Sequence, residues 1–126
     1  MGKIGFIGGG NMAEALIKGL IASGAVKKGD ITVSEPVDKR RAYLKSTYGV
    51  AVTGDNKEAA SGSDVVILSV KPNTIKKALL EIKSQITAKK ILVSIAAGIT
   101  TASIAAVLKK KAKIVRTMPN TPALVQ

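Results

Sequence analysis

The chain has 126 residues, of which 46% are hydrophobic and 2% are aromatic. This length supports one domain with a hydrophobic core, and a core of aliphatic side chains favours buried parallel strands covered by helices. The absence of cysteine and histidine excludes disulfides, a catalytic thiol, thiolate metal ligands and the most common general base. We therefore expect no metal site.

The formal net charge of +12 raises the question of a nucleic-acid partner, because clustered basic residues bind phosphate. The lysines are scattered, mostly in pairs such as 27–28 and 76–77, and aromatic side chains for base stacking are nearly absent. We therefore expect a solvated surface and no nucleic-acid partner. No apolar run approaches the roughly 20 residues of a membrane span, and residues 4–7 lack the basic leader of a signal peptide. These features predict a cytoplasmic protein that does not enter a membrane.

Short β-branched runs alternate with segments of helical period along the chain. Strands are predicted at residues 3–7, 31–33, 51–52, 65–69, 91–94 and 114–116. Helices are predicted at residues 12–22, 38–47, 56–61, 74–83 and 101–108. The turns between them contain the breakers Gly24, Gly29, Pro36, Gly49 and Pro72. This alternation indicates right-handed βαβ units, and so an α/β fold with a mostly parallel sheet in a single domain of residues 1–126.

A glycine-rich turn follows the first predicted strand. Residues 8–13 (GGGNMA) fit the pattern G-x-G-x-x-G/A at the start of a helix. In such a turn Gly8 allows the bend, Gly10 lets the backbone approach a pyrophosphate, and Ala13 lets the helix pack closely on the strand. A phosphate-loop NTPase is excluded, because Asn11 stands where that motif needs lysine. The turn predicts a dinucleotide ligand on a Rossmann-type, doubly wound sheet with helices on both faces.

The end of the second predicted strand bears on the choice between NAD and NADP. An acidic residue there would bond the adenosine ribose, whereas basic residues would accommodate the 2′-phosphate of NADP. Glu35 can take the acidic role, while Ser34, Lys39, Arg40 and Arg41 are candidates for the phosphate. Both NADH and NADPH therefore stay open, with a slight preference for NAD. A solvated charged loop is the alternative interpretation of the basic residues.

Four segments, in this order, resemble pyrroline-5-carboxylate reductases: residues 4–12 (IGFIGGGNM), 69–72 (SVKP), 93–98 (VSIAAG) and 116–123 (RTMPNTPA). The resemblance covers the whole chain, and the last three segments discriminate better than the glycine turn. It implies a nicotinamide cofactor and the reduction of 1-pyrroline-5-carboxylate, a small-molecule substrate, to L-proline in proline biosynthesis. It also implies that the cofactor lies across the carboxyl ends of the strands, where ligands of doubly wound sheets bind.

The resemblance also assigns residues to the cofactor. It places the pyrophosphate at Ile7, Gly8, Gly9, Gly10, Asn11 and Met12. It places the adenosine ribose at Glu35 and the adenosine side at Asn56. The nicotinamide half would be lined by Ser69, Val70, Lys71, Pro72, Ile95, Ala96 and Ala97. Asn120 is a candidate for orienting the substrate. Without the resemblance, tight packing explains the two alanines and a local Asx turn explains Asn120 equally well.

The chain offers no convincing proton donor for the imine, and hydride transfer itself belongs to the cofactor. The catalytic residues therefore stay unknown. The resemblance implies that the family continues with an all-helical domain that dimerises and completes the substrate pocket, so we expect a homo-oligomeric full-length protein and a nearly inactive isolated chain. Two alternatives stay open. The loop at 116–122 disfavours a non-catalytic NAD(P)-binding or redox-sensing module, and its MPNTP residues disfavour a β-hydroxyacid-type dehydrogenase.

Overall fold

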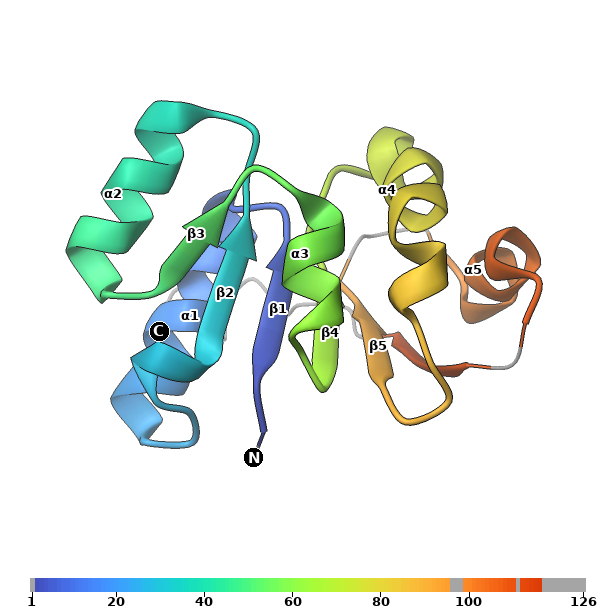
Figure 1. Ribbon diagram of the computed structural model, residues 1–126, viewed down its shortest axis with the longest axis horizontal. Coiled ribbons are helices and arrows are strands. Elements are labelled where there is room, and N and C mark those ends of the chain that lie inside the picture. Colours follow the sequence, from blue (N-terminus) through green and yellow to red (C-terminus); the bar gives the residue numbers. More distant parts are fainter. Residues whose placement is uncertain (1, 96–98, 111, 117–126) are drawn as a thin grey trace.

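The computed structural model describes residues 2–95, 99–110 and 112–116. Within these residues six strands form one sheet in the order β3-β2-β1-β4-β5-β6, and every neighbouring pair is parallel (Figure 1). The strands are β1 (Ile4–Ile7), β2 (Ile31–Ser34), β3 (Ala51–Thr53), β4 (Val65–Leu68), β5 (Ile91–Ser94) and β6 (Lys113–Arg116). This order is that of a doubly wound Rossmann fold, so the predicted fold class is confirmed.

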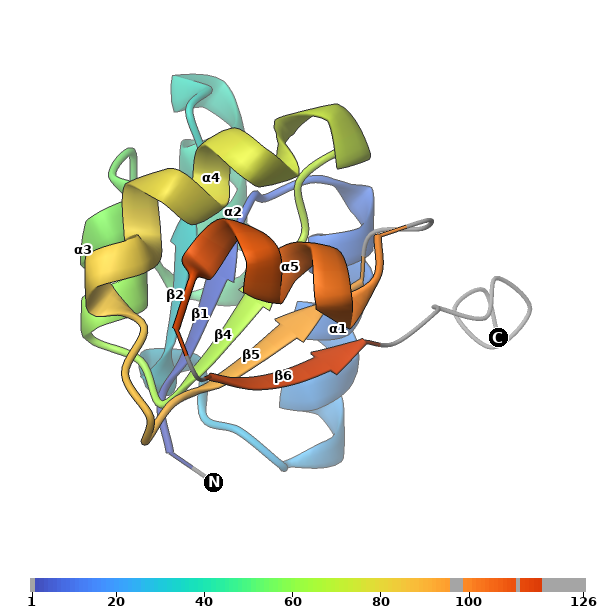
Figure 2. The same ribbon diagram turned by 90° about the vertical axis from the view of Figure 1, so that its right-hand side faces the viewer.

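Five α-helices of the described chain cover the two faces of the sheet. One face carries α1 (Asn11–Ser23) and α2 (Asp38–Tyr48), and the other carries α3 (Asn56–Ser61), α4 (Ile75–Ile82) and α5 (Thr101–Leu108). Figure 2 shows α4 and α5 in front of the sheet and α1 behind it. Both α1 and α2 end at a glycine in the left-handed region, Gly24 with φ 76° and Gly49 with φ 74°, which is the usual way to stop a helix.

The predicted elements are all present, and each observed boundary lies within one residue of the predicted one. The 3-10 helices at Lys28–Asp30, Pro72–Thr74 and Lys83–Gln85 were not predicted. They are single turns without a hydrophobic period of their own, so nothing in the apolar pattern marks them. Pro72 opens the second of them, which explains why α4 begins at Ile75 rather than at the predicted residue 74.

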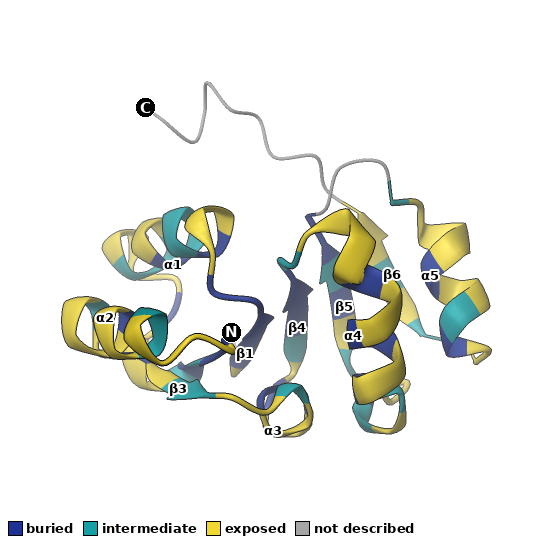
Figure 3. Cartoon of the chain, turned by 90° about the horizontal axis from the view of Figure 1, so that it is seen from above, coloured by how far each residue is buried: buried dark blue, intermediate teal, exposed yellow. Residues whose placement is uncertain are grey.

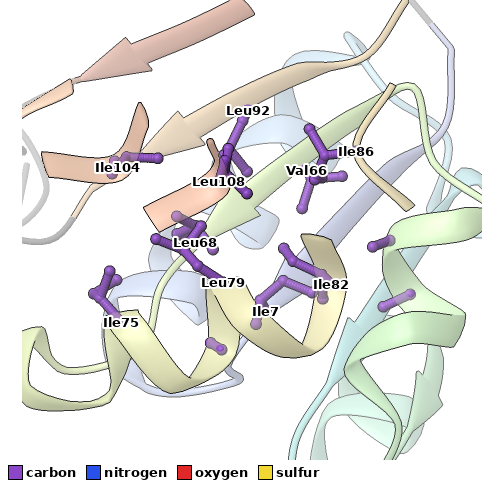
Figure 4. Close-up of a cluster of buried hydrophobic side chains, with 13 residues drawn as sticks. Ile7, Val66, Leu68, Ile75, Leu79, Ile82, Ile86, Leu92, Ile104 and Leu108 are labelled. Carbon is purple, nitrogen blue, oxygen red and sulfur yellow. The ribbon is translucent and has the colours of Figure 1, made fainter. Parts of the chain in front are cut away.

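The core under α4 and α5 holds the segment that follows β4 in place. Ile7 of β1 and Leu68 of β4 pack there with Leu79 of α4 and Leu108 of α5, and all four are at most 1% exposed (Figure 4). Burying one such side chain stabilises the fold by roughly 1.5–3 kcal/mol. On the same face Gly5 admits α3, since a Cβ there would lie 2.5 Å from the carbonyl oxygen of Ala59. The start of α4 is thereby fixed above the strand ends.

The opposite core joins the first helix closely to the sheet. Phe6 of β1, Ala13 and Ile17 of α1 and Leu44 of α2 are all fully buried. Figure 3 shows buried residues, in dark blue, on the sides of α1 and α2 that face the sheet, and exposed residues, in yellow, on their outer sides. The small side chain of Ala13 lets the first turn of α1 approach the strand, as the glycine-turn motif predicted. The position of the α1 N-terminus is therefore set by packing.

The carboxyl ends of β1 and β4 lie side by side, but the chain leaves them toward opposite faces. β1 leads into α1 on one face, and β4 leads toward α4 on the other. Ligands of doubly wound sheets bind in the crevice that such a divergence opens. The predicted site residues after β1, β2 and β4 therefore meet at one edge of the sheet. In the described part of the chain, no helix is long and apolar enough to cross a membrane.

Candidate functional site

The turn after β1 bends at Gly8, whose φ is 105°. Its N–H donates to the carbonyl oxygen of Ser34 at 2.8 Å. A Cβ at Gly8 would lie 2.9 Å from Cγ1 of Val70 and 3.0 Å from the carbonyl oxygen of Ser69. Conformation and space both require glycine here, because side chains disfavour this φ and the neighbouring backbone leaves no room.

Gly10, two residues later, lies in open surroundings. It is exposed, and a Cβ built on it would meet no atom within 4 Å. Gly10 caps α1 without a side-chain hydrogen bond, and the Glu14 N–H donates to its carbonyl oxygen at 2.9 Å. The N–H groups of the turn before Glu14, at residues 11–13, therefore have no intrahelical acceptor. Open space in front of such donors fits an anionic group.

A pocket of about 240 Å³ opens beside this turn, at the carboxyl ends of β1, β2 and β4. We call it the strand-end pocket. Among the described residues its walls are formed by Gly8, Ser34, Pro36, Gly54, Asn56, Val70, Thr74, Lys77, Ala78 and Glu81. Four of these ten residues were assigned to the cofactor from the sequence, namely Gly8, Ser34, Asn56 and Val70. The structure thus brings together predicted residues from four separate segments of the chain.

Polar side chains around the strand-end pocket are held by bonds between neighbouring elements. The Ser34 hydroxyl donates to Oδ1 of Asn56, which joins β2 to the first turn of α3. The Ser69 hydroxyl lies 2.7 Å from the carbonyl oxygen of Gly8, to which it donates, and 3.0 Å from that of Ile7. This bond fastens the glycine turn to the end of β4. Lys71 follows as an exposed residue.

Glu35 and Arg40 do not belong to the residues that line the strand-end pocket. The buried Glu35 carboxylate accepts the Gly9 N–H at 3.0 Å on one oxygen and the Val37 N–H at 2.9 Å on the other. Arg40 donates from Nε to the carbonyl oxygen of Gly9 at 2.6 Å and pairs with Glu14 at 2.7 Å. In this arrangement both side chains hydrogen-bond the backbone of the glycine turn, and the ribose contact expected for Glu35 stays a prediction.

The other basic candidates after β2 also lie outside the lining of the strand-end pocket. Arg41 donates to the carbonyl oxygen of Glu35 and pairs with Asp38. Lys39 is exposed and does not line the pocket. The positive charge nearest the pocket comes instead from Lys77 on α4.

One face of α4, which no sequence motif marked, also contributes to the site. Thr74, Ala78 and Glu81 line the strand-end pocket together with Lys77, and their spacing of three to four residues puts them on one side of the helix. The start of this helix directly after a strand end could have signalled that face. A larger groove of about 670 Å³ shares Lys77 and Glu81 with the pocket and is also lined by Lys57, Asn73, Lys76 and Leu80. Three lysines and one glutamate line this groove, so its formal charge is positive.

Ile95 directly follows β5. Ile95 is buried and donates its N–H to the carbonyl oxygen of Leu68 at 3.2 Å, next to the start of the Ser69 segment. Ala96, Ala97 and Asn120 lie outside the described residues. Within the described ranges, no group of three or more acidic side chains is placed to hold a metal ion.

Glu14 joins the first helix to the second beside the glycine turn. Its carboxylate accepts hydrogen bonds from the hydroxyls of Tyr43 and Tyr48 and forms an ion pair with Arg40. The hydrogen bonds from Tyr43 and Tyr48, followed by that from Arg40, hold the pKa of the Glu14 carboxyl below its ordinary value of 4.5. The same contact raises the pKa of the Tyr48 hydroxyl, because the phenol must stay protonated to donate.

We expect Glu14→Gln to lower the free energy of unfolding by about 1 kcal/mol near neutral pH, with less effect in acid. The folded-state pKa of Glu14 is depressed, so the carboxylate stabilises the fold above its unfolded pKa, and this contribution is lost as the pH falls through the folded value. Urea unfolding between about pH 3 and pH 7 measures the difference. If the difference in the free energy of unfolding between wild type and Glu14→Gln is the same at every pH, the stabilising role of the Glu14 carboxylate is contradicted. Asp30→Asn provides the matched control.

The family model described as NADP oxidoreductase coenzyme F420-dependent matches residues 3–98. The chain is 45% identical over 123 residues to a pyrroline-5-carboxylate reductase of Escherichia coli (strain K12), covering 98% of this chain and 46% of that protein. A pyrroline-5-carboxylate reductase structure from Coxiella burnetii superposes with a TM-score of 0.92 at 41% identity, covering 98% of this chain and 46% of that one.

A second solved structure is that of Plasmodium falciparum pyrroline carboxylate reductase with NADP bound. It has a TM-score of 0.84 at 31% identity and covers 98% of this chain and 44% of that one. The chain thus spans less than half the length of the relatives it matches. The family match includes the glycine turn and every residue of the strand-end pocket, and the predicted resemblance to pyrroline-5-carboxylate reductases is confirmed. The chain belongs to the family of NADP oxidoreductases described as coenzyme F420-dependent.

Proposed function

We propose that the chain is the NADH- or NADPH-binding domain of an oxidoreductase that reduces 1-pyrroline-5-carboxylate to L-proline. The observation that carries the proposal is the open space at Gly10, where a Cβ meets nothing, in front of the α1 N-terminus. A pyrophosphate fits there, because the absent side chain lets it approach the backbone and the helix dipole favours its charge. The relative of known structure with NADP bound supports the same ligand class.

Each part of the chain has its own role in this proposal. The N–H groups of Gly10, Asn11 and Met12 bind the pyrophosphate, and the strand-end pocket with Ser34 and Asn56 receives the adenosine half. The segments that begin at Ser69 and at Ile95 line the nicotinamide half and keep water from one side of it. When bound, the nicotinamide supplies the hydride that reduces the C=N bond of the substrate.

The substrate side and the assembly are also part of the proposal. Asn120 orients the substrate, and the names of the relatives support 1-pyrroline-5-carboxylate as that substrate. We place the protein in the cytoplasm, with its lysines solvated rather than bound to nucleic acid, and we expect the full-length family member to be a homo-oligomer. Size measurement of the full-length protein tests the assembly. Salt-dependent binding of any DNA duplex without competition from NADPH would contradict the assignment of the lysines.

Direct titration tests the cofactor proposal. The purified protein is titrated with NADH and with NADPH at moderate salt, and nicotinamide fluorescence reports binding. We expect one saturable site for each cofactor, with displacement by the oxidised form. A protein with the circular dichroism of an α/β fold that binds neither cofactor, by fluorescence or by calorimetry, would refute the proposal.

Lys77 is expected to favour NADPH, since it is the basic residue among the pocket-lining side chains while Glu35 is engaged by backbone N–H groups. Lys77→Met should weaken NADPH binding by about three- to tenfold and NADH binding by less, because only NADPH carries the 2′-phosphate. The titration with NADH and with NADPH measures both dissociation constants. Lys76→Met is the matched control, since Lys76 lines the outer groove but not the strand-end pocket. Equal weakening of the two cofactors would show that Lys77 does not recognise the 2′-phosphate.

A further inference from the structure

The Gly9 backbone is held on both sides by side chains that come later in the chain. Its N–H donates to Oε1 of Glu35 at 3.0 Å, a buried bond across 26 residues. Its carbonyl oxygen accepts from Nε of Arg40 at 2.6 Å, across 31 residues. The middle residue of the three glycines therefore has no backbone polar group left for a ligand.

Gly9 is also tightly packed against the elements that supply these side chains. A Cβ there would lie 2.9 Å from Cδ1 of Leu44, 3.1 Å from Cγ1 of Val33 and 3.2 Å from Cβ of Glu35. Gly9 is thus pressed onto β2 and α2, while Gly10 next to it faces open space. The turn has a closed side at Gly9 and an open side at Gly10.

The hydrogen bonds of Gly9 with Glu35 and Arg40 fix the direction of the neighbouring peptide groups. In a planar trans peptide the C=O and the next N–H point in opposite directions. Because Arg40 draws the Gly9 carbonyl toward α2, the Gly10 N–H points away from α2. Because Glu35 likewise holds the Gly9 N–H, the Gly8 carbonyl points away from Glu35. On that side the Ser69 hydroxyl donates to the Gly8 carbonyl oxygen at 2.7 Å. Two successive peptide planes are therefore oriented by three side chains.

We propose that Glu35 and Arg40 are positioning residues that orient the Gly10 N–H toward the pyrophosphate of the cofactor, rather than residues that choose between NAD and NADP. The inference rests on the proposed function for the identity of the ligand. Three consecutive glycines have a large conformational freedom, so an unrestrained turn would have to be ordered when the ligand binds. Glu35 and Arg40 order it beforehand, and Arg40 is itself held by Glu14 of α1 at 2.7 Å.

The two roles predict different effects of Glu35→Ala. A positioning residue acts on the pyrophosphate, which both cofactors share, so we expect weaker binding of NADH and NADPH by the same factor of about ten. A ribose-selecting residue would change the ratio of the two dissociation constants. Arg40→Met removes the other bond while keeping most of the aliphatic stem, and it is expected to act in the same direction on both cofactors.

Two further variants separate positioning from a general loss of charge. Glu35→Gln keeps one acceptor oxygen and is expected to fall between wild type and Glu35→Ala. Asp38→Asn removes the same charge at the start of α2, but Asp38 pairs with Arg41 and not with the glycine turn. Its cofactor affinities are expected to equal those of the wild type. The thermal midpoint of each variant is recorded to show that the fold is retained.

Amide hydrogen exchange at Gly9 decides the inference independently of any ligand. The Gly9 N–H is expected to be protected in the wild-type protein and to exchange faster in Glu35→Ala. An unprotected Gly9 N–H, an unchanged exchange rate in the variant, or a changed ratio of the NADH and NADPH dissociation constants would each overturn the inference. A wild-type protein that binds neither cofactor would refute the proposed function instead, and hydrogen exchange would still report whether Glu35 holds the turn.

Discussion

Gly10→Val is expected to abolish measurable binding of NADH and NADPH while leaving the fold intact. A Cβ at Gly10 contacts no protein atom, so the valine costs nothing in packing within the protein. Its methyl groups fill the space that the pyrophosphate needs in front of α1. We expect the affinity to fall by at least about 100-fold, which corresponds to roughly 2.7 kcal/mol.

The measurement for Gly10→Val is the cofactor titration, accompanied by a denaturant unfolding curve. Gly19→Val is the matched control, because Gly19 lies in α1, the helix that Gly10 caps, is exposed, and would also place its Cβ in empty space. The control should bind both cofactors like the wild type. Retained affinity in Gly10→Val, with the control unaffected, would mean that the pyrophosphate does not approach the backbone at this turn.

Gly8→Ala is expected to have the largest effect on stability, lowering the free energy of unfolding by about 2–4 kcal/mol. Two costs add at this position. The φ of 105° is strained for any residue with a side chain, and the new Cβ would overlap Val70 and the backbone of Ser69. Because the Ser69 segment is fixed by the core under α4, it has little freedom to move away.

Urea unfolding of the two glycine variants separates the strain from the overlap. Gly24→Ala is the reference, since Gly24 also has a positive φ, of 76°, but a Cβ there meets nothing within 4 Å. We expect this variant to lose only about 1 kcal/mol, from conformation alone. If Gly8→Ala loses no more than Gly24→Ala, the close approach of Gly8 to the end of β4 is not maintained in solution.

The sequence predicted the fold closely because its turns contain residues with strict conformational demands. Gly24 and Gly49 end their helices with positive φ, and Gly8 bends the chain after β1. Between such breakers, parallel strands covered on both faces appear as short, continuously apolar runs, which makes their place in the chain easy to recognise. The 3-10 helix at Pro72–Thr74 escaped prediction because a single turn has no period to detect.

The candidate site was predictable in place but not in the direction of its side chains. Position alone put Glu35 at the end of β2, where a ribose contact is the usual role. The ribose role stays a prediction, and what the position did not indicate is the bond from the Gly9 N–H to this carboxylate, a contact between residues 26 positions apart. Such a contact depends on how far α2 approaches the glycine turn, which local patterns do not contain. Lys77 was not predicted for a similar reason, because it lines the strand-end pocket only through the placement of α4.

The contact between α1 and α2 also provides an intrinsic fluorescence probe. The sequence has two tyrosines and no tryptophan, and the hydroxyls of both tyrosines bond the Glu14 carboxylate in the first turn of α1, directly after the glycine turn. A carboxylate that accepts a hydrogen bond from a phenol quenches tyrosine emission. The ultraviolet fluorescence of the whole chain therefore originates at one junction, and a rise in its intensity marks the separation of these two helices.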